Sequence, residues 1–250
     1  MKIDDIILKH DTRGISKLSE AISDNSCLSA ANLILNNSGK VFITTGFYIL
    51  SAQSPETDGP PGAIALGNTL EKLGYEIVYI TDKYCVSILN GLKSKKSRII
   101  EFPILNQKKS KVYSEQLISK EEPNLLISIE RCGASFDHKY RNMNNQDISD
   151  FTAKIDYLFN LHSKTIGIGD GGNEIGMGNI KNEISKSQTL VDYPTLSKVN
   201  NLIIASVSNW GAYGLLAALS IKSNSNLLPD KKDQENIIIK MIQMGAVDGF

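Results

Sequence analysis

The sequence lacks the features that mark secreted, membrane-spanning and nucleic-acid-binding proteins. Its 250 residues include three cysteines without any C-x-x-C spacing, which argues against a disulfide framework and a zinc site. No apolar run approaches the ~18 residues of a membrane span, and the acidic start at residues 1–5 is unlike a signal peptide. The formal net charge is zero, so nothing favours nucleic acid or an anionic membrane as a partner. These absences predict a cytoplasmic protein.

Motifs of several enzyme classes are missing as well. There is no G-K-[ST] phosphate loop, and the glycine-rich segment does not follow the G-x-G-x-x-G pattern into a helix. No serine–histidine or cysteine–histidine pair accompanies a recognisable nucleophile elbow. His10 and His162 fall in or beside predicted helices, where we expect them at the surface, and His138 lies in a polar loop. The residues that remain favour chemistry based on carboxylates, amides and one arginine.

The composition and the apolar pattern indicate a globular α/β protein. Hydrophobic residues make up 41% and charged residues 22% of the chain, which is ordinary for a folded protein. Strand-like runs alternate with helical patterns, which predicts a doubly wound, mostly parallel sheet with helices on both faces. The predicted strands are 41–45, 76–81, 98–102, 124–129, 165–169 and 201–207; the predicted helices are 60–73, 84–92, 114–120, 151–161, 233–244 and one ending at Ile221. We expect a single domain over 1–250, with a helical N-terminal extension over 1–38.

Two basic segments are expected at the surface. Arg13 falls in an exposed-looking turn, 11–14, ahead of a helix, and an arginine there is usually solvated. The lysine-rich residues 107–111 are expected to form a solvated loop.

The glycine-rich stretch 167–178 is the most informative part of the sequence. Six glycines in twelve residues enclose Asp170, Asn173 and Glu174. Glycine inside a strand often marks the close approach of another backbone or a ligand, and Asp170 falls where the predicted strand ends. A tight acidic turn would also account for the glycines, because glycine is the default residue at positive φ. The interleaved polar residues favour a ligand site over a simple turn.

Polar residues also stand at the carboxyl ends of five predicted strands. They are Thr45 with Gly46, Asp82, Glu130 with Arg131, Asp170, and Ser208 with Asn209 and Trp210. Ligands of parallel α/β sheets bind outside this edge, so we expect these residues to line one cleft. Taken singly, Glu130 and Arg131 could be a surface ion pair, and Trp210 could belong to the core.

These segments resemble the D-glutamate cyclase domain family. The resemblance runs in order through residues 45–47, 56–60, 129–131, 167–178 and 208–213, and it covers roughly residues 40–250. It implies a lyase that converts D-glutamate to 5-oxo-D-proline with loss of water, and therefore a dicarboxylic amino acid as the small-molecule partner. The sequence departs from the family pattern at His138 and Arg141.

The resemblance and the chemistry of cyclisation together suggest roles for individual residues. The reaction needs a base for the amine, donors for the oxyanion and an acid for the leaving oxygen. We assign Glu130, Asp170 and Glu174 to catalysis and expect Arg131 to clamp a substrate carboxylate. The other substrate-binding candidates are Thr45, Gly46, Glu56, Thr57, Asp58, Tyr140, Asn142, Gly171, Gly172, Asn173, Asn209 and Trp210, of which Gly171, Gly172, Asn173 and Asn209 would donate to the oxyanion.

The only cofactor that the sequence suggests is a divalent cation (Mg²⁺, Mn²⁺ or Ca²⁺), and whether one is required stays open. Asp170, with Glu174 or Asp58, would supply its oxygen ligands. Two other functions also stay open: a metal-assisted hydrolase of another small amide or carboxylate, and a non-catalytic binding module. The departure at His138 fits the binding module. A homodimer is compatible with the sequence.

Overall fold

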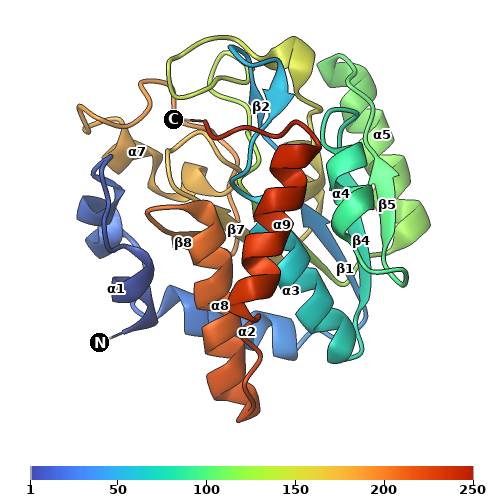
Figure 1. Ribbon diagram of the computed structural model, residues 1–250. Helices are drawn as coiled ribbons and strands as arrows, with labels where there is room; N and C mark the ends of the chain where they lie inside the picture. The colour runs from blue at the N-terminus through green and yellow to red at the C-terminus, as the bar shows by residue number, and fades with distance from the viewer. Residues whose placement is uncertain (1, 250) are drawn as a thin grey trace.

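A computed structural model describes residues 2–249 of the chain. Its centre is a six-stranded sheet in the order β5-β4-β1-β6-β7-β8, in which all neighbouring strands are parallel (Figure 1). The strands are β1 (Lys40–Thr44), β4 (Glu76–Thr81), β5 (Arg98–Glu101), β6 (Leu125–Ile129), β7 (Thr165–Gly169) and β8 (Asn201–Ile204). The six predicted strands and the doubly wound α/β class are confirmed.

Helices cover both faces of this sheet. One face shares an apolar core with α2 (Ser26–Leu35), α3 (Pro60–Lys72), α4 (Val86–Leu92), α8 (Ser208–Ser223) and α9 (Lys231–Gln243). The other face packs against α5 (Gln107–Glu121) and α6 (Asp156–Leu161). Within β1, Val41 and Ile43 join the first core and Phe42 joins the second, which is the two-residue alternation of a strand. The shorter helices are α1 (Ile3–Ile7), η1 (Ile15–Ala21), η2 (Ser149–Phe151), η3 (Met177–Ile180) and α7 (Lys181–Ile184).

Helix α5 corrects one prediction. Residues 107–111, expected as a solvated loop, form the first turn of this helix. The cause is an N-cap, because the Asn106 side chain accepts a hydrogen bond from the Lys109 N–H at 3.0 Å. Several other boundaries also differ from the sequence prediction; for example, α4 begins at Val86, α6 begins at Asp156, and β8 ends at Ile204.

A small hairpin that the sequence did not predict stands near the carboxyl ends of the strands. It consists of β2 (Tyr48–Ile49) and β3 (Ser54–Pro55), which pair antiparallel. The C-terminal segment runs along it, because the Val247 N–H donates to the Pro55 carbonyl at 3.0 Å and the Thr57 N–H donates to the Val247 carbonyl at 2.8 Å. The segment that follows α9 accordingly passes beside β2 in Figure 1.

Within residues 2–249, no helix is both long and apolar enough to cross a bilayer.

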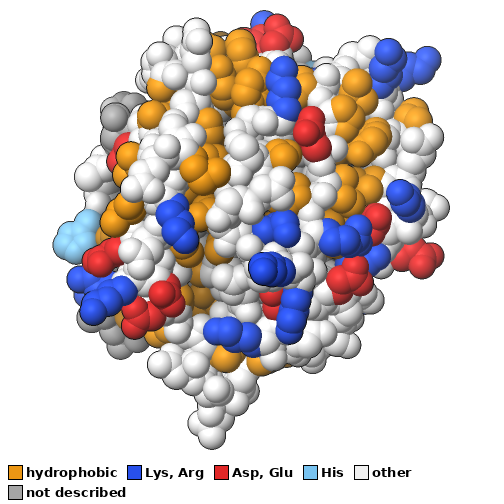
Figure 2. All heavy atoms as spheres, turned by 45° about the vertical axis from the view of Figure 1, so that its right-hand side comes forward, with side chains coloured by type: hydrophobic (Ala, Val, Ile, Leu, Met, Phe, Trp, Pro, Cys, Tyr) orange, Lys and Arg blue, Asp and Glu red, His pale blue; other side chains and the backbone are white. Residues whose placement is uncertain are grey.

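The face shown in Figure 2 carries apolar side chains in bands between lysine and arginine side chains. Helix α9 buries Met241 in the core and leaves Ile239 and Ile242 exposed. The homodimer stays a prediction.

Candidate active site

The order of the strands changes direction between β1 and β6. Strands β4 and β5 follow on one side of β1, whereas β6, β7 and β8 follow on the other. Such a switch point opens a crevice at the carboxyl ends of the strands. A cavity of about 470 Å³ lies there, and its lining includes Arg13, Glu56, Asp58, Glu130 and Asp170. The structure thus brings Glu130 and Asp170 together, as their positions at strand ends predict.

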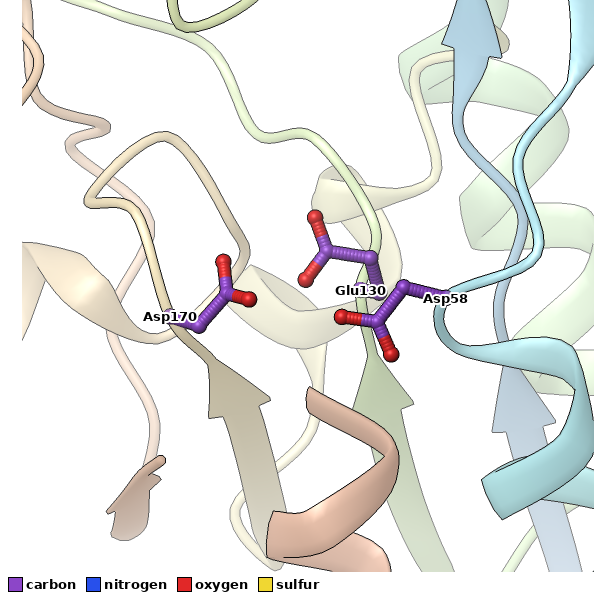
Figure 3. Close-up of side chains that lie close together, drawn as sticks. All are labelled: Asp58, Glu130 and Asp170. Carbon is purple, nitrogen blue, oxygen red and sulfur yellow. The ribbon is translucent and has the colours of Figure 1, made fainter. Parts of the chain in front are cut away.

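Three carboxylates converge on this cavity. Asp58, Glu130 and Asp170 each place an oxygen within 4.8 Å of the other two, and their side chains point toward one another in Figure 3. Burial, followed by repulsion from the neighbouring carboxylates, raises the pKa of Glu130 and of Asp170 well above the usual range. Burial also raises the pKa of Asp58. A cluster of this kind retains protons at neutral pH or binds a cationic group.

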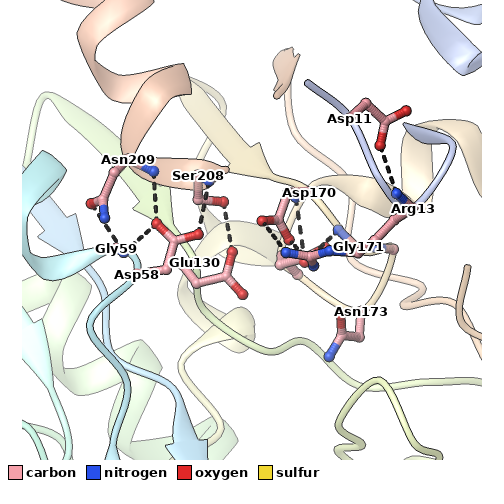
Figure 4. A network of polar contacts seen from close by, with 12 residues as sticks. Asp11, Arg13, Asp58, Gly59, Glu130, Asp170, Gly171, Asn173, Ser208 and Asn209 are labelled. Carbon is pink, nitrogen blue, oxygen red and sulfur yellow. Dashed lines mark hydrogen bonds and ion pairs between the residues drawn. The ribbon is translucent and has the colours of Figure 1, made fainter. Parts of the chain in front are cut away.

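Asp58 is fixed in place as a cap of helix α8. Its carboxylate accepts hydrogen bonds from the Ser208 N–H at 2.9 Å and the Asn209 N–H at 2.8 Å (Figure 4). These donors favour the anion and so oppose the effect of burial on the pKa of Asp58. The Asp58 carboxylate is therefore held at the start of a helix, where a negative charge is stabilising.

Asn209 supports this cap and does not face a substrate. Its side-chain carbonyl accepts from the Gly59 N–H at 3.1 Å and the Gly62 N–H at 2.8 Å, and its amide nitrogen donates to the Thr57 carbonyl at 3.2 Å. These bonds tie the first turns of α3 and α8 together. The predicted oxyanion role of Asn209 is corrected, because the side-chain amide already has partners on both sides.

Glu130 is the least stabilised anion of the three carboxylates. Its φ of +48° is unusual for a residue other than glycine. The Ser208 hydroxyl donates to its Oε2 at 2.6 Å, and among residues 2–249 we see no second donor to this carboxylate. Asp58 has backbone donors and Asp170 has an arginine, so Glu130 is the member of the cluster best suited to hold a proton.

Gly59 permits the close packing beside Glu130. Its φ is +98°, and a Cβ added there would lie 2.7 Å from the Glu130 Cβ and 2.5 Å from the Thr45 Oγ1. Both the backbone conformation and the contact distance require glycine. Thr45 therefore packs under the site, and its carbonyl accepts from the Thr81 hydroxyl at 2.8 Å.

Asp170 forms a bidentate ion pair with Arg13. The Arg13 Nη1 lies 2.7 Å from Oδ1, and Nη2 lies 2.9 Å from Oδ2. Asp11 holds the arginine's own backbone, because its carboxylate accepts from the N–H groups of Arg13 and Gly14, both at 2.9 Å. Burial alone would lower the pKa of Arg13, but the charges of Asp170, Glu130 and Glu174 raise it above its usual value. The prediction of a solvated Arg13 is wrong, and its guanidinium lines the cavity.

Glu174 organises the glycine-rich loop from inside. Its carboxylate accepts from the Gly171 N–H at 2.8 Å and the Gly172 N–H at 2.7 Å, and the side chain is buried. None of these three residues is part of the cavity lining. The predicted roles of Glu174 in catalysis and metal binding, and of Gly171 and Gly172 as oxyanion donors, are corrected, because these groups satisfy one another.

Arg131 points away from the cavity. Its guanidinium donates to the Asp82 carboxylate at 2.6 Å, to the Gly46 carbonyl at 2.7 Å and to the Ala153 carbonyl at 2.8 Å. Only 2% of the residue is exposed. The predicted substrate clamp is wrong, because Arg131 instead joins the ends of β1 and β4 to the segment before α6.

Some of the remaining predicted residues line the cavity, and the others lie outside its lining. Glu56, Asn142 and Asn173 line the cavity, and burial together with the nearby Asp58 raises the pKa of Glu56 to about 8. Tyr140 is buried and donates to Asp156, and Trp210 packs beside His10 near α1, so neither lines the cavity. The backbone carbonyl of Gly46 accepts a hydrogen bond from the Arg131 side chain, and that of Thr57 accepts one from the Asn209 side chain. His138 lines a separate, open hollow beside the start of α5.

A divalent cation would find oxygen ligands in Asp58, Glu130 and Asp170, without Glu174. Such oxygen donors suit Mg²⁺, Mn²⁺ and Ca²⁺. Backbone N–H groups already occupy the Asp58 carboxylate, and Arg13 occupies both oxygens of Asp170. The residues therefore fit a cation poorly while Arg13 remains paired with Asp170.

Comparison with solved structures adds little. The Bordetella bronchiseptica enzyme WbmH in complex with NAD⁺ shares 17% identity at a TM-score of 0.34, over 53% of this chain and 40% of that one. A short-chain dehydrogenase from Streptomyces avermitilis shares 8% identity at a TM-score of 0.35, over 83% and 94% of the two chains. Similarities this weak carry no argument about function.

Comparison with known sequences is more informative. The chain is 35% identical over 214 residues to the human protein named D-glutamate cyclase, mitochondrial. The match covers 78% of this chain but 35% of the human protein, so the chain spans about a third of the length of that relative. A family model described as D-glutamate cyclase-like, C-terminal, matches residues 3–250, which include Arg13 and all three clustered carboxylates. The chain therefore belongs to the D-glutamate cyclase-like, C-terminal family.

Proposed function

We propose that this chain converts D-glutamate to 5-oxo-D-proline and water. Family membership and the identity to a human protein named D-glutamate cyclase support this reaction. The observation that carries the proposal is the cluster of Asp58, Glu130 and Asp170 beside Arg13 in one cavity. A few convergent polar groups in a cavity of this size are typical of a small-molecule site. Here they offer partners for an ammonium group and for a carboxylate on the same molecule.

Binding brings the two reacting groups of the substrate together. The α-ammonium group lies against Asp58 and Asp170, whose negative charges are held by backbone N–H groups and by Arg13. The charge of Arg13, and not that of Arg131, attracts a substrate carboxylate. Folding the substrate so that the amine meets the γ-carboxyl group is itself a large contribution, because effective molarities in such reactions reach about 10⁵–10⁸ M.

Glu130 carries the protons in this mechanism. It takes a proton from the α-ammonium group, and the freed nitrogen attacks the carbon of the γ-carboxyl group. A C–N bond forms, and the positive charge of Arg13 stabilises the oxyanion. A C–O bond then breaks as Glu130 delivers protons to the leaving oxygen. Two protons pass from nitrogen to oxygen in succession, and the oxygen leaves as water.

The environment of Glu130 suits both proton uptake from the nitrogen and proton delivery to the oxygen. A general acid–base group works best when its pKa lies near the working pH, and burial raises the pKa of Glu130 toward that range. The hydrogen bond from Ser208 to Oε2 fixes the orientation of the carboxylate.

Product formation tests the proposal. The full chain is incubated with D-glutamate, L-glutamate and other D-amino acids, and 5-oxoproline is measured by chiral mass spectrometry. Glu130→Gln and Asp170→Asn should each lower the rate at least about 10²-fold. Glu115→Gln is the matched control, because Glu115 is exposed on α5. A folded wild-type chain that forms no 5-oxoproline from D-glutamate would reject the proposal.

A further inference from the structure

Carboxyl groups outnumber cationic side chains in the lining of the cavity. Four carboxylates line it, those of Glu56, Asp58, Glu130 and Asp170, and among the lining residues that the structure describes Arg13 alone is cationic. Arg13 is already paired with Asp170 at 2.7 Å. Free D-glutamate brings two more carboxylates into this surrounding, whereas a derivative with an amide at the γ position brings one. The α-ammonium group is the same in both, so charge complementarity favours the neutral γ group.

The cavity also has more room than glutamate needs. Its volume of about 470 Å³ corresponds to roughly fifteen waters at about 30 Å³ each. The lining also includes apolar side chains, those of Phe47, Ile49 and Leu50 from the hairpin region and of Met143 from the loop after β6. An uncharged, partly apolar group matches these side chains better than a carboxylate does.

The loop of residues 142–146 has no charged side chain and is held by hydrogen bonds among its own residues. The side-chain amide nitrogen of Asn142 donates to the Gln146 side chain at 2.8 Å, and its side-chain oxygen, Oδ1, accepts from the Asn144 and Gln146 N–H groups, both at 3.0 Å. No lysine or arginine of this loop segment, 142–146, is available to a carboxylate. The loop can therefore border an amide group without adding charge.

From these features, and resting on the function proposed above, we infer that the chain also cyclises γ-amides of D-glutamate and prefers them to free D-glutamate. The departing amine lies against the four apolar side chains of the lining, Phe47, Ile49, Leu50 and Met143. We call these four residues the amine subsite.

The reaction balances without a further reactant. The α-amine nitrogen forms a bond to the γ-carbonyl carbon, and the C–N bond of the amide breaks. Two protons leave the α-ammonium nitrogen in succession. Glu130 passes one to the departing nitrogen, and the second ends on the released amine, or in solvent when that amine is weakly basic. The products are 5-oxo-D-proline and the released amine, which is ammonium when the substrate is D-glutamine. Protonation of the departing nitrogen is the step that a carboxylic acid assists most directly.

The inference is tested with D-glutamate, D-glutamine and γ-D-glutamyl-p-nitroanilide, each beside its L form. Chiral mass spectrometry of 5-oxoproline gives kcat/KM for every substrate, and absorbance follows the released nitroaniline. We expect kcat/KM of both D-amides to exceed that of D-glutamate at least tenfold. Leu50→Ala and Met143→Ala should lower the ratio of anilide to D-glutamine kcat/KM at least threefold. Leu73→Ala, at an exposed site after α3, should leave that ratio unchanged.

The outcomes separate this inference from the proposed function. Conversion of D-glutamate with no conversion of either D-amide overturns the inference and leaves the proposed function standing. Conversion of the amides alone supports the inference and restricts the function to amides. If neither D-glutamate nor an amide yields 5-oxoproline, both are wrong. An unchanged anilide ratio in the Leu50 and Met143 variants overturns the assignment of the amine subsite.

Discussion

Arg13 and Asp170 are 157 positions apart in the chain and meet in a bidentate ion pair. The Asp170 side chain is 2% exposed and that of Arg13 is 19% exposed. An ion pair this deep holds a carboxylate that would be costly to leave alone, because a buried charge without its partner keeps the full desolvation penalty. The N-terminal segment is thereby an integral part of the site.

Arg13→Ala should lower the free energy of unfolding by about 3–5 kcal/mol at pH 8. The loss should be smaller at pH 5, because Asp170 without Arg13 takes up a proton more readily and so avoids a buried charge. Urea denaturation at the two pH values measures the difference. Adding Asp170→Asn to the variant should recover part of the lost stability.

Arg98→Ala is the control for this experiment. The Arg98 side chain is 47% exposed, so its ion pairs should contribute about 0–1 kcal/mol. An Arg13→Ala variant that loses the same stability at both pH values would contradict the assigned role of Asp170.

Ser208→Ala should move the pH profile of kcat upward. The Ser208 hydroxyl donates to the Glu130 carboxylate and so favours its anion. Without that bond the pKa of Glu130 rises further. The acidic limb of the kcat profile, where turnover requires anionic Glu130, therefore shifts to higher pH. Glu130→Gln should lower turnover at least about 10²-fold and leave the melting temperature within about 3 °C of the wild type. An unshifted profile in an active Ser208→Ala variant would argue against Glu130 as the proton carrier.

Glu56 should make the protein less stable as the pH rises from about 4 to 8. An unfolded glutamate has a pKa of about 4.3, whereas burial and Asp58 raise the pKa of folded Glu56 to about 8. Between these values the folded state binds more protons than the unfolded state, so stability falls with increasing pH. Glu56→Gln should flatten this profile and add about 1–3 kcal/mol at pH 8.5. Glu115→Gln, measured beside it by urea denaturation, should reproduce the wild-type slope.

Arg131→Ala should act on stability and not on substrate affinity. The guanidinium bonds Asp82 and two carbonyls in the interior, and breaking a buried pair costs about 3–5 kcal/mol. Thermal and urea denaturation measure the loss. A stable variant with a raised KM alone would restore Arg131 as a substrate clamp.

Mn²⁺ should stabilise the Arg13→Ala variant more than the wild type. Asp58, Glu130 and Asp170 offer carboxylate ligands, and removal of Arg13 frees both oxygens of Asp170. Binding to the folded state alone raises the melting temperature in proportion to the logarithm of free metal over Kd. If Mn²⁺ raises the melting temperatures of the wild type and of the Arg13→Ala variant equally, the metal binds elsewhere. The Arg98→Ala variant is the control, because it loses an arginine that lies outside the cavity.

The strands were predictable because local pattern determines them. Most contain a short apolar run that is largely buried, as in β6, Leu125–Ile129, which is buried on both faces, and such a run carries its own signal. The hairpin at β2 and β3 carries no comparable signal, because each strand has two residues and its pairing depends on the C-terminal segment.

Glu130 and Asp170 face the cavity, as their positions at strand ends predicted, whereas the predicted direction of the Arg131 side chain was wrong. Glu130 and Arg131 are adjacent, but the positive φ of Glu130 sends the two side chains apart, one to Ser208 and the other to Asp82. Sequence patterns do not reveal such a turn at a residue other than glycine. Asp11 does offer a local signal for a structured turn at Arg13, since short acidic side chains often bond the backbone just ahead of them. The contact of Arg13 with Asp170 depends on the fold and had no local signal.

The position of Asp58 at the start of α8 makes this helix a reporter of events in the cavity. The amides of Ser208 and Asn209 depend on the Asp58 carboxylate for their hydrogen bonds. A ligand that draws Asp58 away, or that gives it a proton, loosens the first turn of α8 and exposes those amides to exchange with solvent. A ligand that only adds contacts leaves the turn closed. Amide hydrogen exchange at two backbone positions can thus distinguish how different molecules engage the same carboxylate.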